Sequence, residues 1–169
     1  MDLGISNKRV LITGASRGIG AEIARHFAKE GCKISLIARN KENLESVMEE
    51  IGGVGAGHDY LNINLRDPDA PQKAINTFFS RHGSLDIAVH NVGGGLGIKD
   101  PLSKMEDWLD VWKFNVGIAI EMNSLLVPHM QKLKWGRIIH ISSINAVTGG
   151  TMVEPYGGSP AYSCAKAYL

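Results

Sequence analysis

The sequence predicts an α/β fold in which a doubly wound parallel β-sheet is covered by helices on both faces. Three observations lead to this prediction. Short apolar runs typical of buried strands alternate along the chain with segments of helical periodicity. A glycine-rich segment follows the first of these runs. The chain has 169 residues, which suffices for one hydrophobic core, so we expect a single domain over residues 1–169.

Each expected strand is a short apolar run. In chain order the runs cover residues 9–13, 33–38, 60–63, 86–90 and 137–141, and the third gives the weakest signal. Helices are expected between them. The first shows apolar residues at helical spacing and ends at Gly31. The second, over residues 41–51, is charged and amphipathic, and the third runs from Pro68 to about His82.

The fourth expected helix is long, and a capping box over residues 103–106 opens it. Pro128 is expected to kink this helix. Its core-facing residues are predicted to be Trp108, Trp112, Val116, Ile120 and Leu126. After the fifth strand, the glycine-rich residues 149–158 predict a loop, and Ala161 begins a last helix.

The order of these elements predicts where a ligand binds. Right-handed crossovers and the glycine turn after the first strand imply the Rossmann-type strand order 3-2-1-4-5. In such sheets, ligands bind at the carboxyl ends of the strands. The residues that follow strands one, two, four and five include Gly14, Arg39, Asn91 and Ser143. We therefore expect the functional site at this edge of the sheet.

Composition excludes several classes of function. The net charge is +1, so there is no basic footprint for nucleic acid. No apolar run approaches the length of a membrane span, and the acidic N-terminus lacks the blocks of a signal peptide. Cys32 and Cys164 are far apart, which makes a disulfide framework unexpected and a reducing cytoplasm the default location. The histidines show no metal-ligand spacing, so no metal site is predicted.

The segment Thr13–Gly20 is suited to holding a dinucleotide. Its glycines at 14, 18 and 20 allow a tight turn and a close approach to a pyrophosphate. A helix that begins near Gly18 then offers free N–H groups and its positive end to the phosphates. The alternative is a plain strand–turn–helix with incidental glycines, but the placement between a strand and a helix favours the dinucleotide.

The end of the second strand indicates which cofactor is preferred. An NAD site is expected to carry an acid there for the ribose 2′-hydroxyl, whereas this chain has Ala38, Arg39 and Asn40. A guanidinium matches phosphate geometry, so Arg39 is placed to bind a 2′-phosphate, with Arg17 approaching the same group. We therefore expect NADP(H) to be preferred over NAD(H). The alternative is that both arginines are merely solvated.

Tyr162 and Lys166 are one helical turn apart near the end of the chain. Reduction of a ketone needs a proton for the developing alkoxide, and a tyrosine can supply it. A tyrosine normally has a pKa of about 10, which is high for acid–base work at neutral pH, and a cation beside the ring stabilises the phenolate. Ser142 and Ser143 follow an apolar strand, where a hydroxyl is able to orient the substrate oxygen. By itself the Tyr–Lys spacing is also compatible with an exposed helical turn.

In combination, these motifs resemble those of the short-chain dehydrogenase/reductase family, over essentially all 169 residues. The matching segments are the glycine motif at 13–20, Asn115 after Phe114, the serines at 142–143, and Tyr162 with Lys166. The resemblance implies that Tyr162 donates or accepts the proton, that Ser143 positions the substrate and that Lys166 binds the nicotinamide ribose. It also implies that Asn115 holds a water of a proton relay. The residues assigned in this way to the cofactor are Gly14, Ser16, Arg17, Gly18, Ile19, Gly20, Arg39, Asn64, Asn91, Gly93, Tyr162 and Lys166.

The chain departs from the family pattern at three places. The family's Asn-Asn-Ala-Gly after strand four is His90-Asn91-Val92-Gly93 here, which keeps the second asparagine and the glycine. Asn64 stands where the family often has an aspartate against adenine, and an amide can still bond the base edge. The segment between Ser143 and Tyr162 is longer than usual, so we expect residues 149–160 to form a loop over the site. Tyr156 is an alternative acid–base residue at the shorter spacing, but it lacks a lysine one turn later.

Two classes of function follow from the sequence. The first is an NADP(H)-dependent oxidoreductase that interconverts a ketone and a secondary alcohol, with a small carbonyl or alcohol compound as substrate. The second is a nucleotide-binding module, or an inactive fragment, without turnover. Leu169 follows shortly after Lys166, so the resemblance implies further C-terminal strands that this chain lacks. It also implies a homodimer or homotetramer built through the long helix and the Tyr162 helix.

Overall fold

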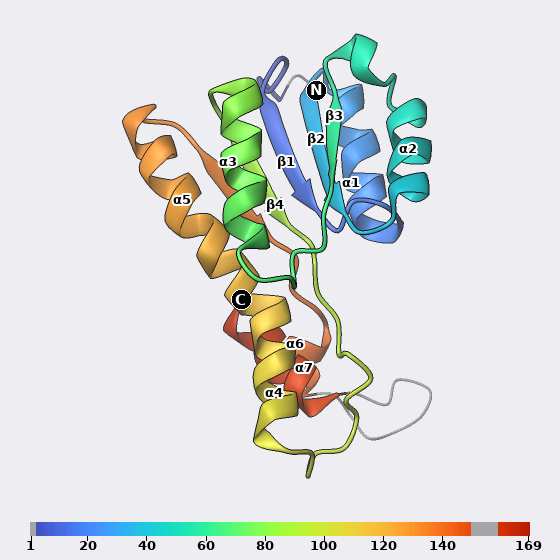
Figure 1. Cartoon of the computed structure of the whole chain (residues 1–169), viewed down its shortest axis with the longest axis vertical. Helices are drawn as coiled ribbons and strands as arrows, with labels where there is room; N and C mark the ends of the chain where they lie inside the picture. Colours follow the sequence, from blue (N-terminus) through green and yellow to red (C-terminus); the bar gives the residue numbers. More distant parts are fainter. Residues whose placement is uncertain (1–2, 150–158) are drawn as a thin grey trace. The chain divides into compact units, whose positions relative to one another are not determined.

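The computed structural model describes residues 3–149 and 159–169 (Figure 1). Its contacts divide the chain into two compact units. The sheet unit comprises Met1–Asn91 and Glu121–Ile139, and the helical unit comprises Val92–Ile120 and His140–Leu169. Each unit is described by itself below.

The five-stranded sheet has the order β3-β2-β1-β4-β5, which confirms the predicted order. The strands are β1 (Arg9–Thr13), β2 (Lys33–Ala38), β3 (Asp59–Asn62), β4 (Ile87–His90) and β5 (Arg137–His140). β1 pairs in parallel with both β2 and β4, and β2 pairs in parallel with β3. Leu11, Ile12 and Leu36 are fully buried, as expected for strands covered on both faces.

Helices cover both faces of the sheet (Figure 1). α1 (Gly18–Lys29) and α2 (Lys41–Glu50) lie on one face, and α3 (Ala70–His82) and α5 (Ile118–Lys132) lie on the other. A short 3₁₀ turn, η1 (Val54–Ala56), precedes β3. The predicted positions of the first two helices are confirmed to within a residue or two.

The predicted start of the third helix was wrong. α3 begins at Ala70, with Pro71 in its first turn, rather than at Pro68. Asp69 has a φ of 58°, a left-handed conformation that no α-helix accommodates, so the helix starts after it. Pro68 lies instead in a turn closed by the bond from the Ala70 N–H to the Asp67 carbonyl, at 3.1 Å.

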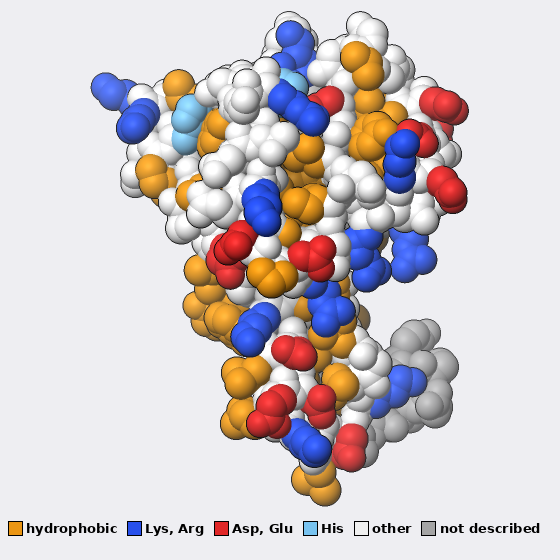
Figure 2. All heavy atoms as spheres, viewed as in Figure 1, with side chains coloured by type: hydrophobic (Ala, Val, Ile, Leu, Met, Phe, Trp, Pro, Cys, Tyr) orange, Lys and Arg blue, Asp and Glu red, His pale blue; other side chains and the backbone are white. Residues whose placement is uncertain are grey.

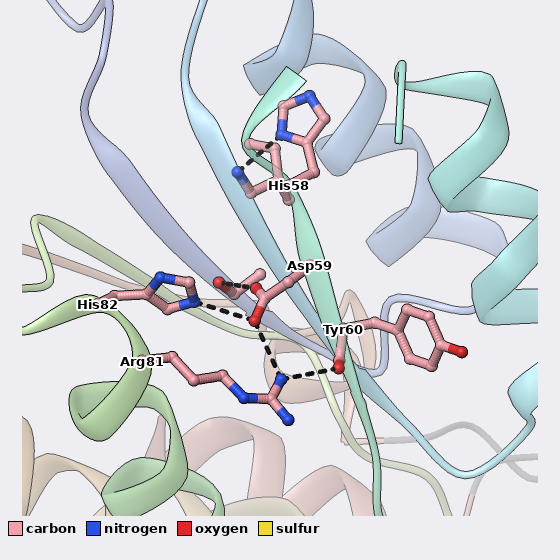
Figure 3. A network of polar contacts seen from close by, with 7 residues as sticks. His58, Asp59, Tyr60, Arg81 and His82 are labelled. Carbon is pink, nitrogen blue, oxygen red and sulfur yellow. Dashed lines mark hydrogen bonds and ion pairs between the residues drawn. The ribbon is translucent and has the colours of Figure 1, made fainter. Parts of the chain in front are cut away.

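The side chain of Asp59, at the start of β3, joins three elements of the sheet unit (Figure 3). It accepts hydrogen bonds from Ser35 of β2 and from Arg81 at the end of α3, and His82 of the same helix lies 2.9 Å from it. Burial would raise the pKa of this carboxyl, but its hydrogen bonds outweigh burial and hold the pKa below its usual value. The carboxylate therefore joins α3 to the sheet edge.

The predicted capping box did not form. α4 (Met105–Trp112) begins at Met105, and its N-cap is Lys104, which makes no side-chain capping bond. Ser103 belongs to the preceding turn, because its N–H donates to the Asp100 carbonyl at 3.1 Å. Within the described residues the Ser103 hydroxyl has no hydrogen-bond partner. The sequence spacing was right for a capping box, but the local turn from Asp100 to Ser103 leaves Ser103 outside the helix.

A π-helical turn, η2 (Lys113–Gly117), separates α4 from α5. Val116 and Leu126 are buried as predicted, whereas Trp112 and Ile120 are exposed, against the prediction. The extra residue in the π-turn rotates the helix face, so one α-helical period cannot describe both sides of it. The irregular turn between α4 and α5 therefore lies at η2. Pro128, the expected position of a kink, lies within α5.

Two further helices complete the helical unit. α6 (Asn145–Thr148) was not predicted, and α7 (Pro160–Tyr168) begins one residue before the expected position. α7 packs on α4 around a small core of Val111, Val116, Ala161 and Ala165. The residues of α7 that matter most, Tyr162 and Lys166, are thus held by a helix with its own hydrophobic support.

Candidate active site

The glycine segment between β1 and α1 is shaped for a dinucleotide. Gly14 and Gly18 have φ values of 66° and 55°, which L side chains rarely adopt. A Cβ at Gly20 would collide with the Gly14 carbonyl and the Asn91 side chain. A Cβ at Gly18, by contrast, would point into open space. The backbone therefore turns tightly and leaves a surface that a pyrophosphate can approach.

The N-terminus of α1 is free to bind an anion. Its N-cap is Arg17, which makes no side-chain capping bond, and its first turn contains no acidic residue. The uncapped N–H groups and the positive end of the helix dipole favour a phosphate. Ile19 is exposed and Ser16 is half-buried beside this turn. These residues fit the pyrophosphate of a nicotinamide dinucleotide.

Asn91, which follows β4, holds the glycine loop through hydrogen bonds. Its amide nitrogen donates to the carbonyls of Thr13 and Gly14, at 3.2 and 3.1 Å. Its backbone N–H donates to the Thr13 hydroxyl at 3.0 Å. Both amide protons are thus used by the loop, so the Asn91 side chain fixes the shape of the glycine turn.

Arg39 follows β2 and is exposed. Within residues 3–149 and 159–169, neither Arg39 nor Arg17 has an acidic partner, whereas Arg25 is paired with Glu22 and Glu50 at 2.9 and 2.6 Å. Figure 2 shows Lys and Arg side chains gathered at the edge of the sheet unit where α1 and α2 begin. Two unpaired guanidinium groups beside strand ends can take a phosphate.

Asn64 is engaged locally. Its amide nitrogen donates to Asp67 at 2.6 Å, and its side-chain oxygen accepts from the Arg66 N–H at 3.3 Å. This leaves one amide proton for a base edge. The sequence analysis did not anticipate this turn, although its contacts join Asn64 to residues only two and three positions away.

The helical unit holds Lys166 in an almost fully buried position, with 3% of its surface exposed. Its ammonium donates to the Ile141 carbonyl at 2.8 Å and lies 5.7 Å from the centre of the Tyr162 ring. Burial lowers the pKa of Lys166. A Cβ at Gly93 would lie 3.0 Å from this ammonium, so the absence of a side chain at Gly93 leaves space for the Lys166 ammonium.

Asn115 lies in the π-turn and is buried. Its side-chain oxygen accepts from the Gly94 N–H at 3.0 Å, and its nitrogen donates to the carbonyls of Gly94 and Val111 at 2.8 and 2.7 Å. The amide therefore fixes the glycine loop after β4, with no amide proton left for a water. A relay water at this residue would have to be bound by its remaining acceptor sites.

The two serines after β5 differ in their partners. The Ser142 hydroxyl donates to the Lys166 carbonyl at 2.8 Å, so its proton is committed to α7. The Ser143 hydroxyl accepts from the Asn145 N–H at 3.2 Å, which leaves its own proton available to a substrate oxygen. The geometry thus favours Ser143 over Ser142 as the substrate-orienting residue.

Sequence reasoning missed Ser159, the N-cap of α7. Its hydroxyl accepts from the Tyr162 N–H at 3.2 Å, and a Cβ at Gly95 would touch it. The signal was present, since Ser followed by Pro is typical of an N-cap and first helical position. The alternative acid–base residue Tyr156 and most of the expected loop over 149–160 lie outside the described residues.

The structure brings the predicted residues together in two groups. The sheet unit joins Gly14, Gly20 and Asn91, and the helical unit joins Gly93, Asn115, Tyr162 and Lys166. Among the described residues, no group of three or more His, Cys, Asp or Glu side chains is arranged to hold a metal ion. No helix in that part of the chain has the length and apolarity needed to cross a membrane.

Comparison with known proteins places this chain in a family. A family model described as short chain dehydrogenase matches residues 8–168. The 3-oxoacyl-acyl-carrier-protein reductase FabG of Escherichia coli is 30% identical over 167 residues, which cover 99% of this chain and 65% of that protein.

Solved structures agree with that match. L-sorbose reductase from Gluconobacter frateurii, solved with NADPH and L-sorbose, has a TM-score of 0.87 and 34% identity, covering 100% of this chain and 62% of its own. NAD⁺-bound xylitol dehydrogenase has a TM-score of 0.82 and 25% identity, covering 96% of this chain and 61% of its own. The chain therefore spans less than two thirds of the length of these relatives. The match over residues 8–168 and the parallel sheet show that the chain belongs to the short-chain dehydrogenase family.

Proposed function

We propose that this chain is the cofactor-binding and catalytic part of an NADP(H)-dependent oxidoreductase that interconverts a ketone and a secondary alcohol. The observation that carries the proposal is the buried ammonium of Lys166 beside the Tyr162 ring, one turn away on α7. A buried charge is costly, so its place next to a phenol calls for a functional reason. A bound nicotinamide would supply the hydride in one direction and accept it in the other.

Proton transfer is assigned to Tyr162. During reduction its hydroxyl gives a proton to the oxygen of the former carbonyl, and the phenolate left behind is stabilised by the charge of Lys166. Ser143 donates a hydrogen bond to the same substrate oxygen and so orients it. Asn115 acts by holding the loop at Gly94 in place. In oxidation, the same groups act in reverse.

The preference for NADP(H) rests on the end of β2. Arg39 and Arg17, which have no acidic partner in the part of the chain that the structure describes, suit a 2′-phosphate, and no acid is present at 38–40 to bind a free ribose hydroxyl. Membership of the family does not decide the question, since one similar structure holds NADPH and another NAD⁺. The residues of this chain support the phosphorylated cofactor.

The proposal is tested with Tyr162→Phe and a panel of small ketones, with NADPH oxidation as the readout. Removal of the phenol hydroxyl should lower turnover by a factor of about 100 or more, because general acid catalysis contributes at least that much. NADPH binding, measured by fluorescence titration, should change little. Undiminished turnover in Tyr162→Phe would contradict the mechanism. Binding of NADPH without turnover of any compound by the unaltered protein would favour a nucleotide-binding module.

We also propose that the protein self-associates through its helical unit. Met105, Leu109 and Trp112 form an exposed apolar stripe along α4, and Tyr168 of α7 packs against Trp112 with ring centres 6.0 Å apart. Figure 2 shows hydrophobic side chains gathered on this side of α4. Exposed apolar patches of this kind mark protein–protein contacts.

A further inference from the structure

Gly95, in the loop after β4, lies against the start of α7. A Cβ at this position would lie 3.3 Å from the Ser159 Cβ, 3.5 Å from the Ser159 hydroxyl oxygen and 3.8 Å from the Tyr162 Cβ. The first of these distances is shorter than an ordinary van der Waals contact. The absence of a side chain at Gly95 therefore lets the N-cap of α7 come this close to the loop.

The backbone conformation of Gly95 does not itself require glycine. Its φ lies outside the left-handed region, whereas Gly97, two residues later, has a φ of 80°. Glycine also loses more conformational entropy on folding than any other residue, so it is costly where its freedom is not used. The close approach of Ser159 is thus the feature of the structure that accounts for a glycine at position 95.

The loop on either side of Gly95 is fixed. The Gly94 N–H donates to the Asn115 side chain at 3.0 Å, and the Gly94 carbonyl accepts from it at 2.8 Å. The Gly95 carbonyl accepts from the Ile98 N–H at 2.9 Å, which closes a turn. Leu96 and Ile98 pack against the core that supports α7. A methyl group added at Gly95 would therefore push on α7, because the loop is held in place.

Ser159 passes such a displacement on to Tyr162. Its hydroxyl accepts from the Tyr162 N–H at 3.2 Å, and its carbonyl accepts from the Ser163 N–H at 2.9 Å. Ser159 is buried, so its side chain cannot turn aside into solvent. A shift of the N-cap thus moves the first turn of α7, which carries the phenol. Proton transfer requires closely matched geometry, so a small shift of the phenol slows the reaction.

We infer that Gly95 is a positioning residue for the proposed proton transfer. Its missing side chain sets how closely the N-cap of α7 docks on the loop after β4, and this docking sets the place of the Tyr162 hydroxyl. Gly95 acts only through Ser159 and the first turn of α7. The inference rests on the proposed function, in which Tyr162 transfers the proton.

The experiment is a double-mutant cycle with Gly95→Ala, Ser159→Gly and the variant that carries both. The readouts are kcat and KM for a ketone, and NADPH affinity by fluorescence titration. Gly95→Ala should lower kcat roughly tenfold, the effect of a misplacement of a few tenths of an ångström, with KM and NADPH affinity little changed. Ser159→Gly removes the Cβ that the new methyl group would meet, and glycine is a tolerated N-cap. The double variant should therefore regain most of the lost kcat.

Gly55→Ala is the matched control, since a Cβ at Gly55 would point into open space and its φ is not left-handed. It should change none of the readouts. Undiminished kcat in Gly95→Ala, or a loss that persists in the double variant, would overturn the role of Gly95. If Gly95→Ala does not fold, recovery of folded, active protein in the double variant supports the same contact, and its absence overturns it.

Tyr162→Phe separates the inference from the proposed function. If this variant retains full turnover, or if the unaltered protein turns over no ketone, the proposed function fails and the role of Gly95 fails with it. If Tyr162→Phe loses turnover while Gly95→Ala keeps it, the inference alone is wrong.

Discussion

At the residue scale, His58 shows how one buried side chain links the stability of this sheet to pH. It is 4% exposed at the start of the β3 edge, and its Nδ1 accepts a hydrogen bond from the Ile34 N–H at 3.0 Å (Figure 3). An Nδ1 that accepts a bond cannot also carry a proton, so the ring is neutral in the folded protein. Burial accordingly lowers the pKa of His58.

We predict that the free energy of unfolding falls as the pH drops below about 6.5, the pKa of a free histidine. The unfolded chain binds the proton more readily than the folded one, so the contribution of His58 to the free energy of unfolding is fully present above the pKa of a free histidine. It is lost through the window down to the lowered pKa of the folded state. Urea unfolding between about pH 7.5 and pH 5 measures the effect, above the range in which carboxylates titrate.

His58→Asn is the informative variant, since its side-chain oxygen can accept the Ile34 N–H but does not titrate. The loss of stability towards pH 5 should be smaller in this variant than in the unaltered protein. Some loss remains, because burial and the charge of Lys166 also lower the pKa of His140. An identical pH dependence in the two proteins would show that His58 is not the group responsible.

At the element scale, α7 depends on its N-cap, the residue that precedes its first turn. The helix has only nine residues, and its N-cap Ser159 accepts the N–H of Tyr162. The Ser159 carbonyl also accepts the N–H and hydroxyl of Ser163, at 2.9 and 3.1 Å. Helices this short are marginal without caps and packing, so the cap helps to set the place of Tyr162.

We predict that Ser159→Ala lowers stability by about 1 kcal/mol and reduces turnover severalfold. Ser159→Asn should restore both, because asparagine is an equally good N-cap. The measurements are thermal unfolding and the rate of NADPH oxidation. Cys164→Ala, an exposed position on the same helix, serves as the control and should change neither. Unchanged turnover in Ser159→Ala would refute a positioning role for the cap.

The sequence predicted correctly those elements whose determinants are local. β1 and β2 have the predicted bounds, because strands buried on both faces are continuous apolar runs. The spacing of Tyr162 and Lys166 likewise lies within one helix. Ser103 and Trp112 were misassigned, because a turn that starts at Asp100 and the π-turn η2 interrupt the regular helical spacing on which those predictions relied. The bonds from Asn115 to Gly94 and from Asn62 to Arg39 join distant segments, and no local pattern reveals them.

At the scale of the whole molecule, the polar residues of the two units carry the proposed ligand-binding roles, and the exposed apolar residues of α4 need a separate explanation. The spacing of Met105, Leu109 and Trp112 places them on one face of that helix, facing away from the core around Val111. A monomer would leave this apolar face in water. Burying it against a second copy removes that cost, and a self-complementary surface naturally gives a symmetric pair.

We predict that the protein is a dimer or tetramer and that Leu109→Glu shifts it towards the monomer, since a charge cannot be buried unpaired in an apolar interface. Sedimentation velocity at several concentrations measures the change. Val54→Glu, at another exposed apolar position but in the sheet unit, is the matched control and should leave the oligomer intact. Two results would reject α4 as the interface. In the first, the unaltered protein sediments as a monomer at every concentration. In the second, the Leu109→Glu variant is as strongly associated as the Val54→Glu variant. If the prediction holds, the apolar face of α4 has its explanation in assembly rather than in catalysis.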